Sequence, residues 1–395
     1  MTATTANLGL YPEILEYGAA DVSACFSCGT CTATCPLGQE QGTFPRRIIR
    51  YAQVGMKDAL LGSKELWACY QCGECSESCP TQADPSEFMA ATRRWAIGQY
   101  DKTRLARTLY TQPIVAILVA VLLAVLFAAF MYSAHGPMDG QRLAIFEWVP
   151  AELIHTTGIA VMIAVVLAGL AGVWTMVRSV GGREGVGWRS VLGSRDALTR
   201  TRRAAWVALG REALGQTIFR RECAADPKSR VIPWYRRRAI VHALVVWGFL
   251  GLLAATALDY GLALLGIKAT GTPVPIWYPV RLLGTVAGVA LLYGTSVLML
   301  DRYRAANRSV RSSTVADWLL LALLWIVAAT GFAIELALYL PDAPAWGYWI
   351  FLVHVAMAME LVLLAPFMKL AHAAYRPLAL FFVAFQALAY TPKEE

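Results

Sequence analysis

The sequence predicts an all-α protein, in which a cysteine-rich N-terminal domain precedes a bundle of six membrane-spanning helices. Of its 395 residues, 57% are hydrophobic, which is too apolar for an ordinary soluble protein. The apolar residues are distributed unevenly. Residues 1–110 are typical of a soluble domain and hold eight of the nine cysteines, whereas from Pro113 onward apolar runs of twenty or more residues alternate with short charged connections.

We therefore divide the chain into residues 1–110 and a membrane domain, 111–395. Each predicted span has the roughly 20 predominantly apolar residues that a crossing requires. The six spans are about 113–133, 153–177, 239–264, 279–300, 316–340 and 348–372. A seventh apolar stretch, PLALFFVAFQALAY, is too short for a span, and we expect it to lie at the membrane interface.

Basic residues predict the orientation of the bundle. The connection 178–238 holds fifteen Arg and Lys residues and 302–315 holds four, whereas the opposite connections hold only Arg142 and Lys268. The positive-inside rule places the two basic connections and both termini in the cytoplasm. The net charge of +8 is then mainly a topology signal, and we do not expect nucleic acid as a partner.

The first residues, MTATTANLGLYPEILEYG, have no basic region followed by an apolar core, so no cleaved secretory signal is expected. The cysteines then stay in a reducing compartment, where metal binding is favoured over disulfides. Within the basic loop 178–238, TRTRRAAWVALGREALGQTIFRRE has apolar positions at helical spacing. This amphipathic helix either lies on the membrane surface or is a dock for the N-terminal domain or a partner subunit.

Two cysteine runs repeat, CFSCGTCTATCP and CYQCGECSESCP, each with the spacing Cys-x2-Cys-x2-Cys-x3-Cys-Pro. Two-cluster iron–sulfur proteins use this spacing, and the fourth cysteine of each run binds the other cluster. Zinc is the alternative, but it usually takes two pairs of ligands, so the third cysteine would be surplus. We therefore predict two [4Fe–4S] clusters, one held by Cys25, Cys28, Cys31 and Cys79 and the other by Cys69, Cys72, Cys75 and Cys35.

The linker RRIIRYAQVGMKDALL has helical periodicity and lets the two runs approach each other, so we predict an α-helical ferredoxin domain. Cys223 is interpreted as a bystander thiol. Residues 20–100 resemble the C subunit of heterodisulfide reductase, in both runs, in PRRIIRYAQVGMKDALL and in LWACYQCGEC. The Cys-Cys-Gly domains of the B subunit, its partner in that enzyme, are absent from the sequence, so the disulfide-reducing site is not expected on this chain.

Two of the five histidines, His354 and His372, lie eighteen residues apart in the last apolar run, HVAMAMELVLLAPFMKLAH. On one continuous helix they would share a face about 27 Å apart, close to the roughly 30 Å of a bilayer core. We interpret them as ligands of two stacked haems, with hydrogen-bonded core or interface histidines as the alternative. For the inner haem His242 pairs with His372, and for the outer haem His155 pairs with His354, with His135 as the competing choice.

The membrane part resembles the cytochrome b subunit (gamma) of respiratory nitrate reductase and the E subunit of heterodisulfide reductase, in HALVVWGF, ADWLLLALLWIVAATGF and PFMKLAH. This implies two haem b groups in a bundle of cytochrome b type. The nitrate reductase relatives have a second haem histidine ten residues after the one matching His242. Here that position is Leu252, which is why His155 is brought in from outside the match.

One chain that joins both modules resembles the C subunits of quinone-interacting membrane-bound oxidoreductase complexes. The resemblance implies a prokaryotic inner membrane, flavin- and iron–sulfur-containing partner subunits related to the A subunit of heterodisulfide reductase, and adenosine phosphosulfate reductase as an indirect partner in sulfate reduction or sulfur oxidation. A heterodisulfide-reductase-type complex is the alternative, and a non-redox anchor holding structural zinc is the third hypothesis.

A relay between menaquinone or ubiquinone and flavoproteins needs a quinone site but no other complete substrate-reducing site. Such a site needs a group that hydrogen-bonds or exchanges protons beside a haem. The two candidates are Arg281, at the outer end of the fourth span, and Glu360, within the sixth.

Overall fold

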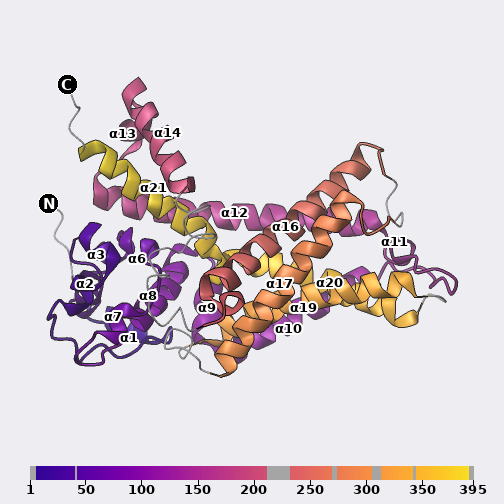
Figure 1. Cartoon of the computed structure of the whole chain (residues 1–395), viewed down its shortest axis with the longest axis horizontal. Helices are drawn as coiled ribbons and strands as arrows, with labels where there is room; N and C mark the ends of the chain where they lie inside the picture. Colours follow the sequence, from indigo (N-terminus) through magenta and orange to yellow (C-terminus); the bar gives the residue numbers. More distant parts are fainter. Residues whose placement is uncertain are drawn as a thin grey trace.

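The computed structural model describes residues 6–40, 42–210, 232–268, 274–304, 313–340 and 344–390. All regular secondary structure in these ranges is helical, which confirms the all-α prediction. The N-terminal domain lies at one end of the long axis and the loop containing α11 (Ile145–Trp148) lies at the other (Figure 1). Cys223 and the second half of the predicted amphipathic helix lie outside the described residues.

Nine helices form the described part of the N-terminal domain. Most are one or two turns long, and α8 is the longest and most deeply buried of them. Its start is set by Pro85 at the first turn and by Asp84, whose side chain accepts a hydrogen bond from the Glu87 backbone N–H. The nine are α1 (Leu10–Leu15), α2 (Thr30–Ala33), α3 (Pro36–Glu40), α4 (Arg46–Gln53), α5 (Lys57–Leu61), α6 (Glu65–Ala68), α7 (Glu74–Glu77), α8 (Pro85–Tyr100) and α9 (Leu105–Thr111).

Six described helices are long and apolar enough to cross a membrane, which confirms the predicted number of spans. Much of their apolar surface is exposed in the isolated chain, as expected for helices that face lipid. They are α10 (Pro113–Tyr132), α12 (Ala151–Glu184), α16 (Arg238–Leu264), α17 (Pro279–Tyr303), α19 (Val315–Tyr339) and α20 (Ala345–Leu364).

The helix α12 is longer than predicted. It continues beyond residue 177 to Glu184, and 34 residues of α-helix span about 51 Å, which exceeds the bilayer core. Its last turns lie against the N-terminal domain, because Gly62 packs on the Ser179 carbonyl and the Arg183 side chain. The second span is therefore also a support for the cysteine domain.

The prediction of one continuous helix between His354 and His372 is wrong. Helix α20 ends at Leu364, two short 3-10 turns follow, and α21 (His372–Tyr390) begins at the second histidine. Pro366 explains the break, because proline has no backbone N–H and restricts the residue before it. Met368 is extended, with φ −111° and ψ −174°, so the chain changes direction before α21. The sixth candidate span accordingly ends at Phe367 rather than at residue 372.

The C-terminal helix α21 contains the whole of the short apolar stretch PLALFFVAFQALAY and is not among the six candidate spans. The described half of the amphipathic segment forms α14 (Arg195–Gly210), which packs along α21 through Ala204, Ala384 and Phe385 (Figure 1). Neither interpretation of the amphipathic helix named this contact. The interfacial location of α21 stays a prediction.

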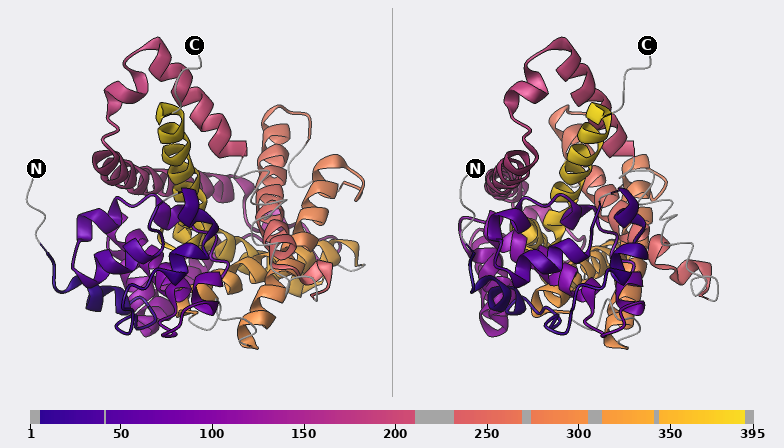
Figure 2. Two further views of the ribbon diagram at one scale, coloured as in Figure 1. Left: turned by 60° about the vertical axis from the view of Figure 1, so that its left-hand side comes forward. Right: turned by 90° about the vertical axis from the view of Figure 1, so that its left-hand side faces the viewer.

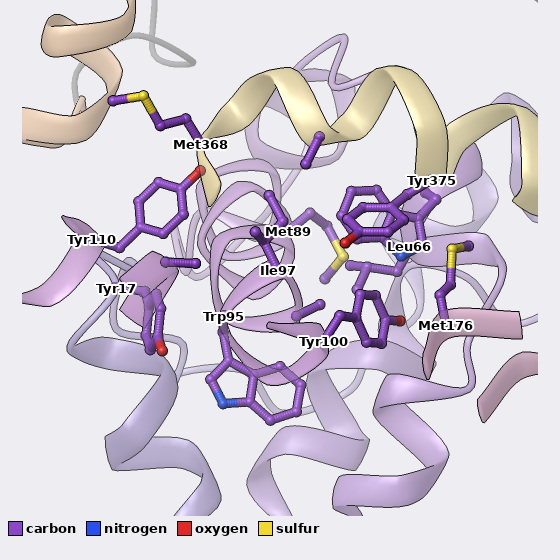
Figure 3. Packing of buried hydrophobic residues seen from close by; sticks show 14 of the residues in the cluster. Tyr17, Leu66, Met89, Trp95, Ile97, Tyr100, Tyr110, Met176, Met368 and Tyr375 are labelled. Atoms are coloured by element: carbon purple, nitrogen blue, oxygen red, sulfur yellow. The ribbon is translucent and has the colours of Figure 1, made fainter. Parts of the chain in front are cut away.

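The two domains share one hydrophobic core. Trp67 and Tyr100 of the N-terminal domain pack on Tyr375 of α21, with ring centroids 5.0 and 5.2 Å from that of Tyr375, and Met176 of α12 lies beside them (Figure 3). Two buried ion pairs reinforce the contact, Arg94–Asp317 at 3.3 Å and Lys64–Glu184 at 2.7 Å.

As a result, the cysteine domain lies at the end of the bundle where α12 ends and α19 begins (Figure 2). This is also the end at which the two most basic connections leave the bundle. The cytoplasmic location of that end stays a prediction from the positive-inside rule.

Candidate electron-transfer site

The two cysteine runs fold in the same way. In each run a glycine follows the second cysteine with a left-handed backbone, Gly29 at φ +93° and Gly73 at φ +98°, and starts a one-turn helix. The third cysteine then lies on that turn. The turns α2 and α7 pack together, and the hydroxyls of Thr34 and Ser78 are 3.0 Å apart. This pairing brings the end of each run to the other run.

The first set of cysteines gathers around Cys31. The pKa of its thiol is raised, first by burial and then by the negative charges of Cys25, Cys28 and Cys79. The fourth cysteine of the second run thus lies beside the first three cysteines of the first run. Cys31 and these three neighbours are the four residues assigned to the first cluster.

The second set gathers around Cys75. Burial raises the pKa of this thiol most, followed by the charges of Cys69, Cys72 and Cys35. The pKa of Cys35 is raised to about 11 by burial and by Cys69 and Cys72. Two groups of four cysteines, crossed between the runs, are the donor set that a pair of [4Fe–4S] clusters would require, although within the described residues no three His, Cys, Asp or Glu side chains are close enough to hold a single metal ion. The assignment of each cysteine to its cluster stays a prediction.

The two sets differ in exposure. In the first set Cys31 is buried, but Cys28 is exposed and the neighbouring Phe26 is 66% exposed. The helix α2, which carries Cys31, lies at the outer edge of the domain (Figure 1). The second set lies next to α6, which packs against α21. The set around Cys75 is therefore nearer the membrane helices, and the set around Cys31 is nearer solvent.

Two arginines hold the loop that carries the second set. Arg376 donates from Nη1 to the carbonyls of Trp67, Ala68 and Cys69 at 2.8, 3.0 and 3.1 Å, and Arg93 donates from Nη2 to the same Cys69 carbonyl at 2.7 Å. Arg376 is 7% exposed and lies one helical turn after His372. Sequence reasoning missed Arg376, although a lone arginine in an apolar run was a usable signal.

The inner histidine pair comes together at the start of α21. The ring centroids of His242 and His372 are 6.4 Å apart with an interplanar angle of 61°. Two imidazoles on opposite sides of one metal ion, at metal–nitrogen distances of about 2 Å, have ring centres about 6 Å apart. Nδ1 of His372 bonds the Lys369 carbonyl, which orients the ring and leaves Nε2 available for iron. These residues fit a bis-histidine haem, and this ligation stays a prediction.

The outer histidines are arranged less simply. Nδ1 of His354 is 2.9 Å from the Thr330 hydroxyl, and the ring lies against Gly331, where a Cβ would be 3.3 Å from it. His155 packs on Tyr260, with ring centroids 4.3 Å apart, and among the described residues it makes no ring contact with His354.

The competing ligand His135 is exposed and stacks on Tyr132 at 4.1 Å. His155 is closer than His135 to the membrane depth of His354. Gly158, one turn after His155 along α12, lies opposite Met359 of α20, which places His155 near the level of His354. Ligation of an outer haem by His155 and His354 stays a prediction.

The two quinone-site candidates have contrasting surroundings. Arg281 is paired with Glu335 at 3.3 Å and lies over the Tyr339 ring at 4.9 Å, so its charge is compensated at the end of α17. Glu360 is 1% exposed, and neither carboxylate oxygen has a hydrogen-bond partner among the described residues. A buried carboxyl group without a partner is unusual and needs an explanation.

Two family models match the chain. Residues 102–392 match the family described as citrate utilization protein B, and residues 21–83 match the 4Fe-4S dicluster domain. The second match supports iron–sulfur clusters rather than zinc in the N-terminal domain. The first covers the whole membrane part and names a family that was not expected from the sequence motifs.

Curated relatives match the N-terminal domain. The H(2)/formate:CoB-CoM heterodisulfide,ferredoxin reductase subunit C2 of Methanococcus maripaludis is 35% identical over 74 residues, 17% of this chain and 40% of that protein. The C subunit of the H(2):CoB-CoM heterodisulfide,ferredoxin reductase of Methanothermobacter thermautotrophicus is 44% identical over 54 residues, 14% of this chain and 29% of the relative. The iron-sulfur C subunit of the CoB--CoM heterodisulfide reductase of Methanopyrus kandleri is 40% identical over 55 residues, also 14% and 29%.

The chain thus spans 29% to 40% of the length of these curated relatives. The predicted resemblance of the N-terminal domain to the C subunit of heterodisulfide reductase is confirmed. These matches cover no more than 17% of this chain.

Proposed function

Since the chain belongs to the citrate utilization protein B family and carries a 4Fe-4S dicluster domain, we propose that it is a membrane electron-transfer subunit. It relays electrons between the quinone pool and cytoplasmic flavoprotein partners, using two haem b groups and two [4Fe–4S] clusters. The protein resides in the inner membrane of a prokaryote with both termini in the cytoplasm. Six apolar helices make it a multi-pass membrane protein.

The observation that carries this proposal is the link between the inner histidine pair and the second cysteine set. His372 begins α21, and Arg376 of the same helix contacts the Cys69 carbonyl at 3.1 Å. One rigid helical turn therefore fixes the separation of a haem site from a cluster site. The order of sites that follows is the outer histidines, His242 and His372, the set around Cys75, and the set around Cys31.

When bound, haems and iron–sulfur clusters exchange single electrons, whereas a quinol releases two electrons together with two protons. The protein's part is to hold and insulate the sites. His372 is oriented by the Lys369 carbonyl, and Arg93 and Arg376 fix the backbone of the second run. The shared core of Trp67, Tyr100 and Tyr375 excludes water between the two domains.

A proton-exchanging group is also needed where a quinol, menaquinol or ubiquinol, is oxidised. We propose Glu360 for this role before Arg281, because the carboxylate of Glu360 is buried without a partner among the described residues whereas Arg281 is compensated by Glu335. The chain is thus an electron-transfer subunit of a quinone-dependent oxidoreductase. It needs no other substrate-reducing site.

Three partner complexes are compatible with this relay. The first has flavin- and iron–sulfur-containing subunits related to the A subunit of heterodisulfide reductase, with adenosine phosphosulfate reductase as the indirect partner. The second is a heterodisulfide-reductase-type complex, which the names of the curated relatives favour. The third, which the family match favours, is a complex in which a cytoplasmic oxidation in citrate utilization supplies the electrons to this chain.

The test has two parts. In the first part, a quinol is added to the purified, detergent-solubilised chain and should reduce its haems and then its clusters. Where the haem potentials favour the reverse direction, the dithionite-reduced chain should instead reduce added quinone. Exchange in neither direction would refute the quinone link. In the second part, the subunits that copurify from native membranes are identified, and the intact assembly is tested with the substrate of each candidate complex. The three complexes differ in both respects, so these measurements distinguish them.

A further inference from the structure

A basic pocket lies beside the first cysteine run. Its volume is about 520 Å³, and it is formed by the loop that starts at Cys25 and by one side of α4. Phe26 lines it from the loop, and Arg46, Arg47 and Arg50 line it from the helix. A fourth arginine reaches its rim, because Arg183 of α12 donates to the hydroxyl of the lining residue Tyr51 at 2.7 Å.

The positive charge of this pocket is only partly compensated. Arg47 is paired with Glu65 at 2.6 Å. Within the part of the chain that the structure describes, Arg46 and Arg50 form no ion pair, and Arg50 is exposed. An exposed aromatic ring and unpaired arginines side by side are typical of the centre of a protein interface.

A purely internal role explains one of these arginines but not the other. Arg46 donates to the Ser27 carbonyl at 3.2 Å and lies 3.2 Å from where a Cβ of Gly29 would be, so it packs on the cysteine loop and offsets the negative charge there. Arg50 is one turn further along α4 and, among the described residues, makes no hydrogen bond to the loop. Its charge faces solvent next to the more exposed cysteine set.

We propose that this pocket and Phe26 form the docking surface for an acidic redox protein. Carboxylates of the partner enter among the arginines, its surface covers Phe26, and its redox group is brought next to the cysteine set around Cys31. The partner's chemistry follows from charge complementarity, which governs orientation and association rate in such encounters. This inference rests on the proposed electron-transfer function and adds the surface at which electrons leave or enter the chain.

The experiment measures electron exchange between the full-length, cofactor-loaded chain in detergent and photoreduced flavodoxin, a small acidic flavin protein, in stopped flow. At low salt, Arg50→Glu and Phe26→Ala should each lower the second-order rate constant, the charge reversal by about tenfold. In high salt the rates of Arg50→Glu and wild type should converge, because screening removes the charge term. Lys102→Glu, an equal change at an exposed lysine elsewhere on the domain, should stay within about twofold of wild type.

Equal rates for Arg50→Glu and wild type, or an equal loss in Lys102→Glu, would overturn the docking surface. Cluster content and reduction by quinol are measured on the same samples. If cluster content and quinol reduction are intact while the flavodoxin rates are the same for all variants, only the proposal of the docking surface is refuted. If quinol and quinone exchange no electrons with the chain, the proposed function fails instead.

Discussion

Arg376 gives the sharpest test of the link between the two domains. Replacing it by glutamine removes a buried positive charge whose Nη1 bonds three carbonyls at the start of the second cysteine run. For an assumed charge-to-cluster separation of about 10 Å and an effective dielectric constant of about 20, one charge contributes about 1.7 kcal/mol, or about 70 mV for a one-electron couple. Loss of a positive charge disfavours the added electron, so the reduction potential of the nearby cluster should fall.

The assay is a redox titration of the full-length chain followed by electron paramagnetic resonance, which separates the signals of the two clusters. Arg376→Gln should lower one midpoint potential by about 70 mV and leave the other within about 20 mV, because the more distant set is better screened. Arg376→Lys keeps the charge and should retain most of the potential while losing stability, about 2 kcal/mol for the charged hydrogen bonds. The exposed Arg107→Gln is the matched control. Two unchanged potentials, or an equal shift of both, would refute the reasoning.

Three further predictions address the site and the domain contact. His372→Ala and His242→Ala should each remove the same haem signal and spare the other, which difference spectra of the two variants check; loss of different haems would separate the pair. Cys79→Ser should abolish the resonance of the cluster built on the first run although Cys79 belongs to the second, and loss of the second-run signal instead would reverse the assignment. Arg94→Met should destabilise the docked cysteine domain by about 2–3 kcal/mol, below the value for a fully uncompensated buried charge, because Asp317 keeps its ion pair with Lys369. Thermal unfolding followed by cluster loss measures it, and an unchanged midpoint would show that the ion pair does not clamp the domains.

Much of the fold followed from local rules. Hydropathy over twenty residues is sufficient to count the spans, because lipid requires that every backbone group be satisfied within the helix. The crossed grouping of cysteines was predicted from the repeated spacing of the two runs and stays a prediction, while Gly29 and Gly73 give both runs the same local conformation. These features depend on neighbours in sequence, so the sequence alone predicts them.

What the sequence did not predict depends on a single proline and on distant contacts. Pro366 ends α20, so the periodicity that placed His354 and His372 on one face did not apply across the break. Arg376 contacts carbonyls about 300 residues away, and no local pattern encodes that pairing. The packing of α14 on α21 is likewise a tertiary contact, which the pattern of neither segment predicts. Burial and ion pairing across the two domains join residues far apart in the sequence, so only the structure shows them.

The most direct test of the proposed relay is a reduced-minus-oxidised spectrum of the purified full-length chain, combined with metal and haem analysis of the same sample. We expect b-type haem bands with about two haems and roughly eight non-haem irons per chain, as two cubane clusters require. A folded preparation that contains zinc in place of iron and shows no haem absorption would contradict this expectation.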